Sequence, residues 1–207
     1  MSETLSKGDQ AREEILTAAE RLFLSQGYHG TSMRAIAREA GNRAVAGLYN
    51  HFPTKEAIFT ALIEEHNPYQ EVLTIMEAAT ADAQTAETFL RTGLTTILQT
   101  MSQHYNFIQL AQIDMREFNG KNMRHVVGEM FFPRIVVVVQ RLTNMPDLRP
   151  MSPVVWMRLM ASLIIGYVFT AQIAPEFVFG DVPHDEWASY FADVLLHGVL
   201  DNDNQPD

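Results

Sequence analysis

The chain has 207 residues, 47% of them hydrophobic, no cysteine and a net charge of −10 at pH 7. This apolar content suffices for a substantial core in one or two domains, and the absence of cysteine excludes disulfides, thiolate zinc sites and cysteine nucleophiles. Residues 1–60 are neutral overall and residues 61–207 hold the whole acidic excess, so contact with nucleic acid is expected only in the N-terminal part.

Helical spacing begins near Gln10 and continues to the glycine at position 27. The apolar residues of this first helix recur at intervals of three and four, at Ile15, Ala18, Ala19, Leu22 and Phe23. Gly27 is expected to end the helix. Residues 1–9 are polar, show no secretory signal and are predicted to form a disordered tail.

Two further helices are predicted on either side of a glycine turn. The apolar face of the first consists of Met33, Ile36, Ala37 and Ala40, and that of the second of Val45, Leu48 and Phe52. Gly41 suits a left-handed position after the first helix, and Asn42 suits the N-cap of the second. This spacing is typical of a helix-turn-helix whose second helix lies in the DNA major groove, although an αα-hairpin without that role has the same spacing.

The charged and capping residues around this pair also have a pattern. Arg34 and Arg38 are four apart, so both lie on one helix face that points to water or to an anion. Thr54 can cap a fourth helix that begins at Lys55 and ends before Asn67-Pro68. Its predicted apolar face consists of Ile58, Ala61 and Leu62.

The segment ILTAAERLFLSQGYHGTSMRAIAREAG, followed by LYNHFPTKEAIF, resembles the DNA-binding domain of the tetracycline-repressor (TetR) family. The resemblance covers residues 12–62 and rests on T-S-x-x-x-I-A-x-x-A-G and L-Y-x-H-F-x-x-K-E in order. It implies an all-α fold with an N-terminal three-helix, helix-turn-helix DNA-binding domain at residues 10–54. A C-terminal helical ligand-binding and dimerisation domain is expected at residues 55–200, linked by the helix from Lys55, with a disordered tail at residues 201–207.

The resemblance also implies which residues contact DNA. The expected contacts to the phosphate backbone come from Thr31, Ser32, Tyr49, His51 and Lys55. Such contacts set the register of the protein on DNA and carry no sequence information directly. Packing against the fourth helix is the alternative role for Tyr49 and His51.

One departure from the family pattern affects the reading of bases. Leu48 follows Gly41 by seven residues, whereas six are usual in the family, and polar Asn42 replaces the usual apolar residue. The extra residue either lengthens the turn or extends the recognition helix. The remaining candidate base readers are Arg43, Ala44, Val45 and Gly47. Arg43 can contact guanine or a phosphate, and Ala44 or Val45 can meet a thymine methyl group. Because so few of these candidates are polar, DNA shape is also expected to contribute to specificity.

The rest of the chain is predicted to be helical, with elements near residues 69–83, 86–105, 106–119, 122–144, 153–173 and 184–198. The run Val136–Val139 alone indicates a buried strand, but its helical flanks and the lack of a partner strand favour a helix that Pro133 kinks. Residues 159–175 are uncharged and barely long enough to span a membrane, so a buried helix of a helical bundle is expected instead.

The last two helices are apolar beyond a single face. Their large apolar side chains are Trp156, Leu159, Met160, Leu163, Ile164 and Tyr167 in one, and Trp187, Tyr190, Phe191, Val194 and Leu195 in the other. FADVLLHGVL resembles the final helix of the family, which implies a homodimer through these two helices. Closing the core of a monomer is the alternative role.

Soft and aromatic side chains between Met101 and Met160 suggest a pocket for a hydrophobic effector. The candidate ligand-binding residues are Met101, Tyr105, Phe118, Phe131, Trp156 and Met160. A plain core accounts for the same composition.

No pattern indicates catalysis, and no cofactor is expected. The chain lacks G-x-S-x-G and H-E-x-x-H motifs, and the pairs His125/Glu129 and Asp114/Glu117 are interpreted as solvated surface pairs that bind no metal. The sequence therefore predicts a cytoplasmic regulator, a repressor that a small molecule releases from a palindromic operator. The alternatives are a regulator without a ligand and a small metal-dependent helical enzyme.

Overall fold

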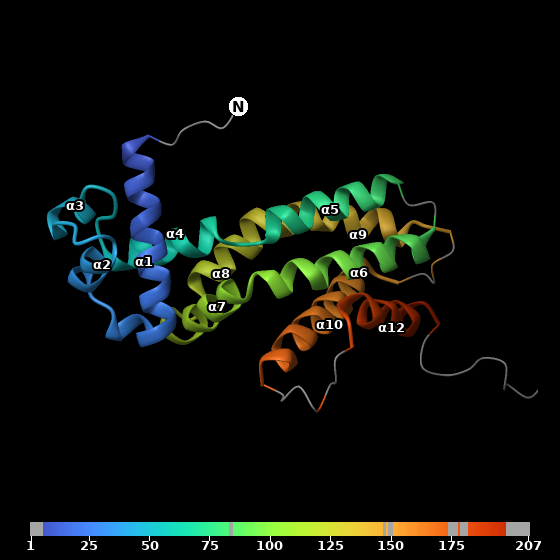
Figure 1. Ribbon diagram of the computed structural model, residues 1–207. Coiled ribbons are helices and arrows are strands. Elements are labelled where there is room, and N and C mark those ends of the chain that lie inside the picture. The colour runs from blue at the N-terminus through green and yellow to red at the C-terminus, as the bar shows by residue number, and fades with distance from the viewer. Residues whose placement is uncertain are drawn as a thin grey trace, which may run out of the picture. The chain divides into compact units, whose positions relative to one another are not determined.

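The computed structural model describes residues 6–82, 85–146, 148, 151–173, 178 and 182–197, and every regular element within these ranges is helical (Figure 1). Contacts divide the chain into two compact units, one from Met1–Asn67 and Tyr105–Glu129 and the other from Pro68–His104 and Met130–Asp207. The expected boundary at Lys55 therefore differs from the division by contacts. The helix that begins at Lys55 packs within the first unit, against its first helix and the residues after Tyr105.

The first unit contains six α-helices in its described part. These are α1 (Lys7–Gly30), α2 (Met33–Glu39), α3 (Val45–Tyr49), α4 (Lys55–Glu65), α7 (Tyr105–Glu117) and α8 (Lys121–His125). The expected tail at residues 1–9 is wrong from Ser6 onward, because Ser6 caps α1 by accepting a hydrogen bond of 3.2 Å from the Asp9 N–H. Residues 1–5 and 201–207 lie outside the described residues. Gly27 interrupts α1 at φ +74°, as predicted.

The core of the first unit forms where α1 meets α4. Ile15 and Phe23 of α1 and Ile58 and Phe59 of α4 are fully buried. The Phe59 ring lies 5.5 Å from that of Phe23 and 4.9 Å from that of Phe118 at the end of α7. Aromatic pairs at such separations stabilise a fold beyond the area they bury. α4 is therefore held on one side by α1 and on another by α7.

The second unit contains α5 (Tyr69–Asp82), α6 (Ala86–Gln103), α9 (Phe132–Thr143), α10 (Pro153–Ile173) and α12 (His184–His197). A π-helical segment, η1 (Val126–Phe131), precedes α9. The valine run is helical, as predicted, and Pro133 lies in the first turn of α9, directly after this π-helical segment. Proline lacks the N–H that an uninterrupted α-helix requires, and a wider turn relieves the clash of its ring with the preceding turn.

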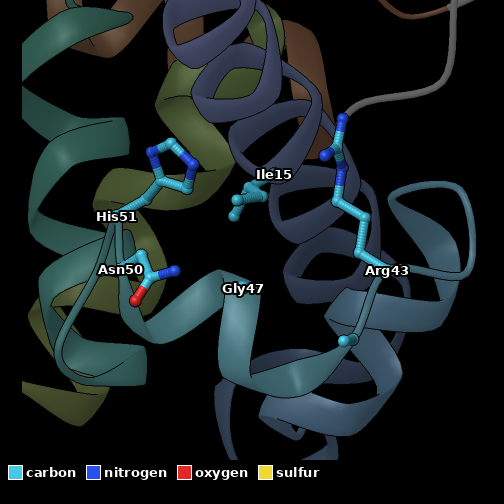
Figure 2. Close-up of a pocket in the computed structure, with 6 residues that line it drawn as sticks. Ile15, Arg43, Gly47, Asn50 and His51 are labelled. Carbon is cyan, nitrogen blue, oxygen red and sulfur yellow. The ribbon is translucent and has the colours of Figure 1, made fainter.

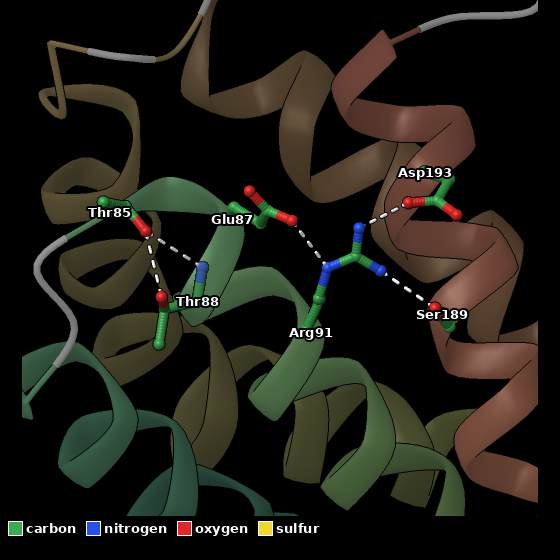
Figure 3. Close-up of polar contacts among 6 residues, drawn as sticks. All are labelled: Thr85, Glu87, Thr88, Arg91, Ser189 and Asp193. Atoms are coloured by element: carbon green, nitrogen blue, oxygen red, sulfur yellow. Dashed lines mark hydrogen bonds and ion pairs between the residues drawn. The ribbon is translucent and has the colours of Figure 1, made fainter.

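A guanidinium group joins α6 to α12 in the second unit (Figure 3). Arg91 donates from Nε to Glu87 at 2.9 Å, from Nη1 to Ser189 Oγ at 2.9 Å and from Nη2 to Asp193 at 2.5 Å. Thr85 caps the start of α6 by accepting a hydrogen bond from the Thr88 N–H. The planar fork of arginine is suited to several acceptors at once, so Arg91 fixes the register between the two helices.

Helix α10 is largely exposed within a single chain. Trp156 is its only fully buried residue, whereas Val154 and Ile165 are 67% and 65% exposed. The prediction of a buried helix at residues 159–175 is therefore not met within one copy of the chain. By length and composition α10 is also the one helix in the described ranges that is apolar enough to cross a membrane.

The pair His66–Glu20, which joins the end of α4 to α1, predicts a pH dependence of stability. Glu20 lies 3.5 Å from the imidazole and, with Glu13 and Glu65, raises the pKa of His66, while His66 and Asn106 lower the pKa of Glu20. The His66 contribution is fully present below pH 6.5 and is lost as the pH rises through its raised pKa, and the Glu20 contribution is lost as the pH falls below 4.5.

His66→Gln is therefore expected to cost about 1 kcal/mol at pH 5.5 and little at pH 9. Urea denaturation of both proteins at the two pH values measures this difference. A cost that is the same at both values would assign His66 a role independent of its charge.

Candidate nucleic-acid interface

The turn between α2 and α3 contains two consecutive left-handed residues, Gly41 at φ +86° and Asn42 at φ +56°. The Asn42 N–H donates to the Arg38 carbonyl at 3.0 Å, and the Arg43 N–H donates to the Ala37 carbonyl at 2.8 Å. Gly41 thus has its predicted conformation, whereas Asn42 is part of the turn and not the N-cap of α3, which is Ala44. The extra residue therefore lengthens the turn, because α3 itself has only five residues.

The predicted base readers lie at the start of α3, but Arg43 is already engaged. Its Nη2 contacts Glu14 of α1, and the side chains are 35% and 44% exposed. Ala44 is exposed and Val45 is half-buried, so Ala44 is the more accessible of the two small readers. Leu48 and Phe52 are buried, as the apolar stripe predicted.

The two hydroxyl groups before α2 have different roles. Thr31 is 2% exposed and donates its hydroxyl to the Gly27 carbonyl at 2.9 Å, so the prediction that it presents this hydroxyl to phosphate is wrong. Ser32 is exposed and is the N-cap of α2, accepting from the Ala35 N–H at 3.2 Å. Thr31 is held inside because the break at Gly27 leaves a carbonyl that needs a donor.

Lys55 points toward the protein at the start of α4. Its Nζ donates to the carbonyls of Tyr28 and Thr31, both at 2.7 Å, and lies 4.1 Å from the centre of the Tyr28 ring. Burial lowers the pKa of Lys55, and the charge of Glu117 partly opposes this shift. Since an ammonium group has three N–H donors, one remains for a phosphate, and that contact stays a prediction.

Tyr49 and His51 differ in accessibility. Tyr49 is 52% exposed at the end of α3, as a DNA contact requires. His51 is half-buried and, with Ile15, Arg43, Ala44, Gly47 and Asn50, lines a hollow of about 350 Å³. Figure 2 shows Asn50 and His51 on one side of this hollow and Arg43 on the other, with Ile15 of α1 between them. Their contacts to DNA stay predictions.

The exposed positive charge of this region lies on α2. Arg34 and Arg38 are both exposed. Their spacing of four places them on one helix face, and both fall at variable positions of the T-S-x-x-x-I-A-x-x-A-G motif. Spacing alone was the signal that could have included them.

The six candidate ligand-binding residues are divided between the two compact units. Met101, Phe131 and Met160 are partly buried against the core of the second unit, which includes Trp156. Phe118 belongs instead to the first unit, where its ring lies 4.7 Å from that of Tyr28, and Tyr105 in the same unit is 46% exposed. Phe118 thus packs in an aromatic cluster with Tyr28 and Phe59, and its role in an effector pocket stays a prediction.

The pairs His125/Glu129 and Asp114/Glu117, both predicted to be solvated, differ in burial. His125 lies 3.3 Å from Glu129 and 3.7 Å from Glu64, and no group of three potential metal ligands occurs in the described ranges. Asp114 is 0% exposed, so its interpretation as a solvated residue is wrong. It accepts hydrogen bonds from the Asn122 side chain at 2.7 Å and the Met123 N–H at 2.9 Å, which explains why a carboxylate is tolerated inside.

A protein family matches the same N-terminal region. Residues 15–62 match the family described as "Bacterial regulatory proteins, tetR family". The chain is 41% identical over 90 residues to the HTH-type transcriptional regulator LmrA of Bacillus subtilis, which is 42% of this chain and 47% of LmrA. It is 37% identical over 59 residues to the repressor AcnR of Corynebacterium glutamicum, covering 28% and 31% of the two chains. These matches span less than half the length of either relative.

Solved structures resemble the chain over most of its length. The TetR family transcriptional regulator PfmR from Thermus thermophilus has a TM-score of 0.68 at 19% identity, covering 90% of this chain and 99% of PfmR. A TetR-family regulator from Bordetella parapertussis has a TM-score of 0.65 at 17% identity, covering 90% and 94%. At these identities the likeness concerns the fold, an N-terminal helix-turn-helix domain followed by a helical domain.

Proposed function

The chain belongs to the TetR family of transcriptional regulators, and from this premise we propose that it binds an operator through α2 and α3 as a ligand-responsive repressor. The observation that carries the proposal is the exposed surface of the helix-turn-helix, where Ser32, Arg34, Arg38 and Tyr49 are accessible. Guanidinium groups and hydroxyl groups are the donors that usually contact phosphate oxygens. Repression is the proposed sign, although the relatives include both the repressor AcnR and the activator FasR.

The proposed assembly is a homodimer through α10 and α12. Large apolar side chains remain exposed on both helices in a single chain, among them Ile165, Phe169, Tyr190 and Val194. Covering them with a second copy removes apolar surface from water. It also brings two recognition helices to a palindromic operator, where half-sites about 34 Å apart double the number of contacts. This arrangement is the reason for proposing a cytoplasmic protein and not a membrane-bound one.

The proposed effector site lies in the second unit around Trp156. The indole Nε1 is buried and has no hydrogen-bond acceptor among the described residues. Partly buried Met101, Phe131 and Met160 pack against the same core. An unsatisfied buried donor is costly, so a hydrophobic molecule with an oxygen acceptor would gain both apolar contact and a hydrogen bond there. A solid core that binds nothing small is the alternative.

Selection of bound DNA from random oligonucleotides tests the DNA-binding function. We expect a palindromic sequence with half-site centres separated by about one helical turn. Arg34→Ala and Arg38→Ala, as phosphate contacts, should each weaken binding on all sequences and reduce the salt dependence. A protein that enriches no sequence and binds DNA no better than both variants would contradict the proposal.

Titration of an effector with and without operator tests the ligand response. Candidate effectors come from a thermal-shift screen of apolar compounds. If effector and operator favour different separations of the recognition helices, each must weaken binding of the other by the same factor. Equal effector affinity in the two titrations would contradict release by the effector, and it would leave the alternative of a regulator without a small-molecule response.

A further inference from the structure

The turn fixes Arg43 beside α1 before any DNA is present. Its backbone N–H is tied to Ala37, and it follows two left-handed residues. The next residue, Ala44, is the N-cap of α3. With its backbone held in this way, only rotation of the Arg43 side chain can direct the guanidinium toward a base at the start of α3 or away from it.

The side chain is held by Glu14. Arg43 Nη2 contacts Glu14 Oε2, across 29 positions of sequence. Arg43 Nε is buried and has no acceptor in the part of the chain that the structure describes. The guanidinium thus has a monodentate partner and, at Nε, a buried donor without an acceptor among the described residues, whereas the edge of a guanine offers two acceptors to the same fork.

The strength of this contact is suited to competition with DNA. Both side chains are more than a third exposed, so water screens the pair and its contribution is small. A bidentate contact to guanine discriminates between bases more strongly than such a pair stabilises the free protein. DNA with guanine at the contacted position can therefore displace Glu14 from Arg43. DNA with another base offers no contact that compensates for the loss of the Arg43–Glu14 pair.

We propose that Glu14 is a specificity-determining residue that restrains Arg43 and limits how far this arginine contributes to base preference. Glu14 contacts no base itself and acts through the position of the guanidinium. The inference rests on the proposed DNA binding through α3. It adds to that proposal a competition within the protein between a carboxylate on α1 and a base of the operator.

The test compares Glu14→Gln with Glu13→Gln, each in the full chain with and without Arg43→Ala. Glu13 is the neighbouring exposed acid on α1, so its replacement makes the same change in net charge away from Arg43. We expect Glu14→Gln to raise affinity for the selected operator about threefold beyond Glu13→Gln, and to sharpen preference at one base pair of each half-site. In the Arg43→Ala background this difference should disappear.

Three results would overturn the inference while leaving DNA binding intact. These are equal effects of the two glutamine variants, a gain that persists without Arg43, and a gain that is the same on every DNA sequence. A wild-type protein that selects no sequence is a different outcome, because it removes the proposed function itself. Matching thermal denaturation midpoints of the variants ensure that changes in folding do not account for the differences.

Discussion

Replacing Asp114 by alanine is expected to lower the free energy of unfolding by about 3 kcal/mol. The carboxylate is fully buried and accepts hydrogen bonds from the Asn122 side chain, from the Met123 N–H and, at 3.4 Å, from the Asn122 N–H. Alanine would leave these donors without an acceptor, and each unsatisfied buried group costs about 1–3 kcal/mol. Urea denaturation followed by circular dichroism measures the loss.

Two variants separate the hydrogen bonds from the volume of the side chain. Asp114→Asn keeps the shape but turns a donor toward donors, so it should lose a large part of the same free energy. Thr60→Val removes only the 2.8 Å hydrogen bond from α4 to Asn122 and should cost about 1 kcal/mol. A loss below about 0.5 kcal/mol for Asp114→Ala would mean that water satisfies the donors and that the network is not stabilising.

This network connects α4 to α7 and α8 within the first unit. Thr60 lies on α4, whose first residue is Lys55, while Asn122 and Asp114 belong to α8 and α7. Buried polar groups tolerate few alternative arrangements, because a buried donor or acceptor that loses its hydrogen-bond partner costs free energy. A shift of α7 or α8 would therefore be transmitted to α4 through Asn122, in addition to the contact between Phe118 and Phe59.

Local sequence signals were sufficient for most of the fold. Thr54 caps α4 through its hydroxyl, Gly41 adopts a left-handed conformation, and α10 begins at Pro153, each as predicted. These features depend on one residue and its immediate neighbours, such as a hydroxyl that meets a free N–H or a residue without Cβ at positive φ. The sequence resemblance also identified the correct family.

Contacts between distant residues were beyond the reach of the same signals. Glu14 meets Arg43 across 29 positions, and Lys55 meets Tyr28 across 27. Both contacts depend on how α1 packs against the following helices, which periodicity alone does not define. Asp114 is buried and not solvated as predicted, because Asn122 and Met123 at the start of α8 donate hydrogen bonds to its carboxylate. Periodicity within α7 does not reveal these partners on another helix. Family motifs identify which residue types matter but not where each side chain points.

Substituting methionine for Lys55 is expected to affect both stability and DNA binding. The ammonium holds the carbonyls of Tyr28 and Thr31, where α1 ends and α2 is about to begin. Hydrogen bonds from charged donors are stronger than neutral ones, so the loss of both should cost about 2 kcal/mol of unfolding free energy. Methionine keeps the apolar stem, which separates the effect of the charge from that of packing. Urea denaturation measures this part of the effect.

The DNA-binding part is measured at a temperature where both proteins are folded, as a function of salt concentration. Lys55→Met should weaken binding equally on operator and unrelated DNA, since neither carbonyl contact nor phosphate contact distinguishes bases. If the third N–H donor also binds a phosphate, as the sequence predicts, the slope of log affinity against log salt should fall by about one per half-site. An unchanged slope with weakened binding would contradict the phosphate contact. Lys55 would then act only by positioning α2, through the two carbonyls that it holds in the free protein.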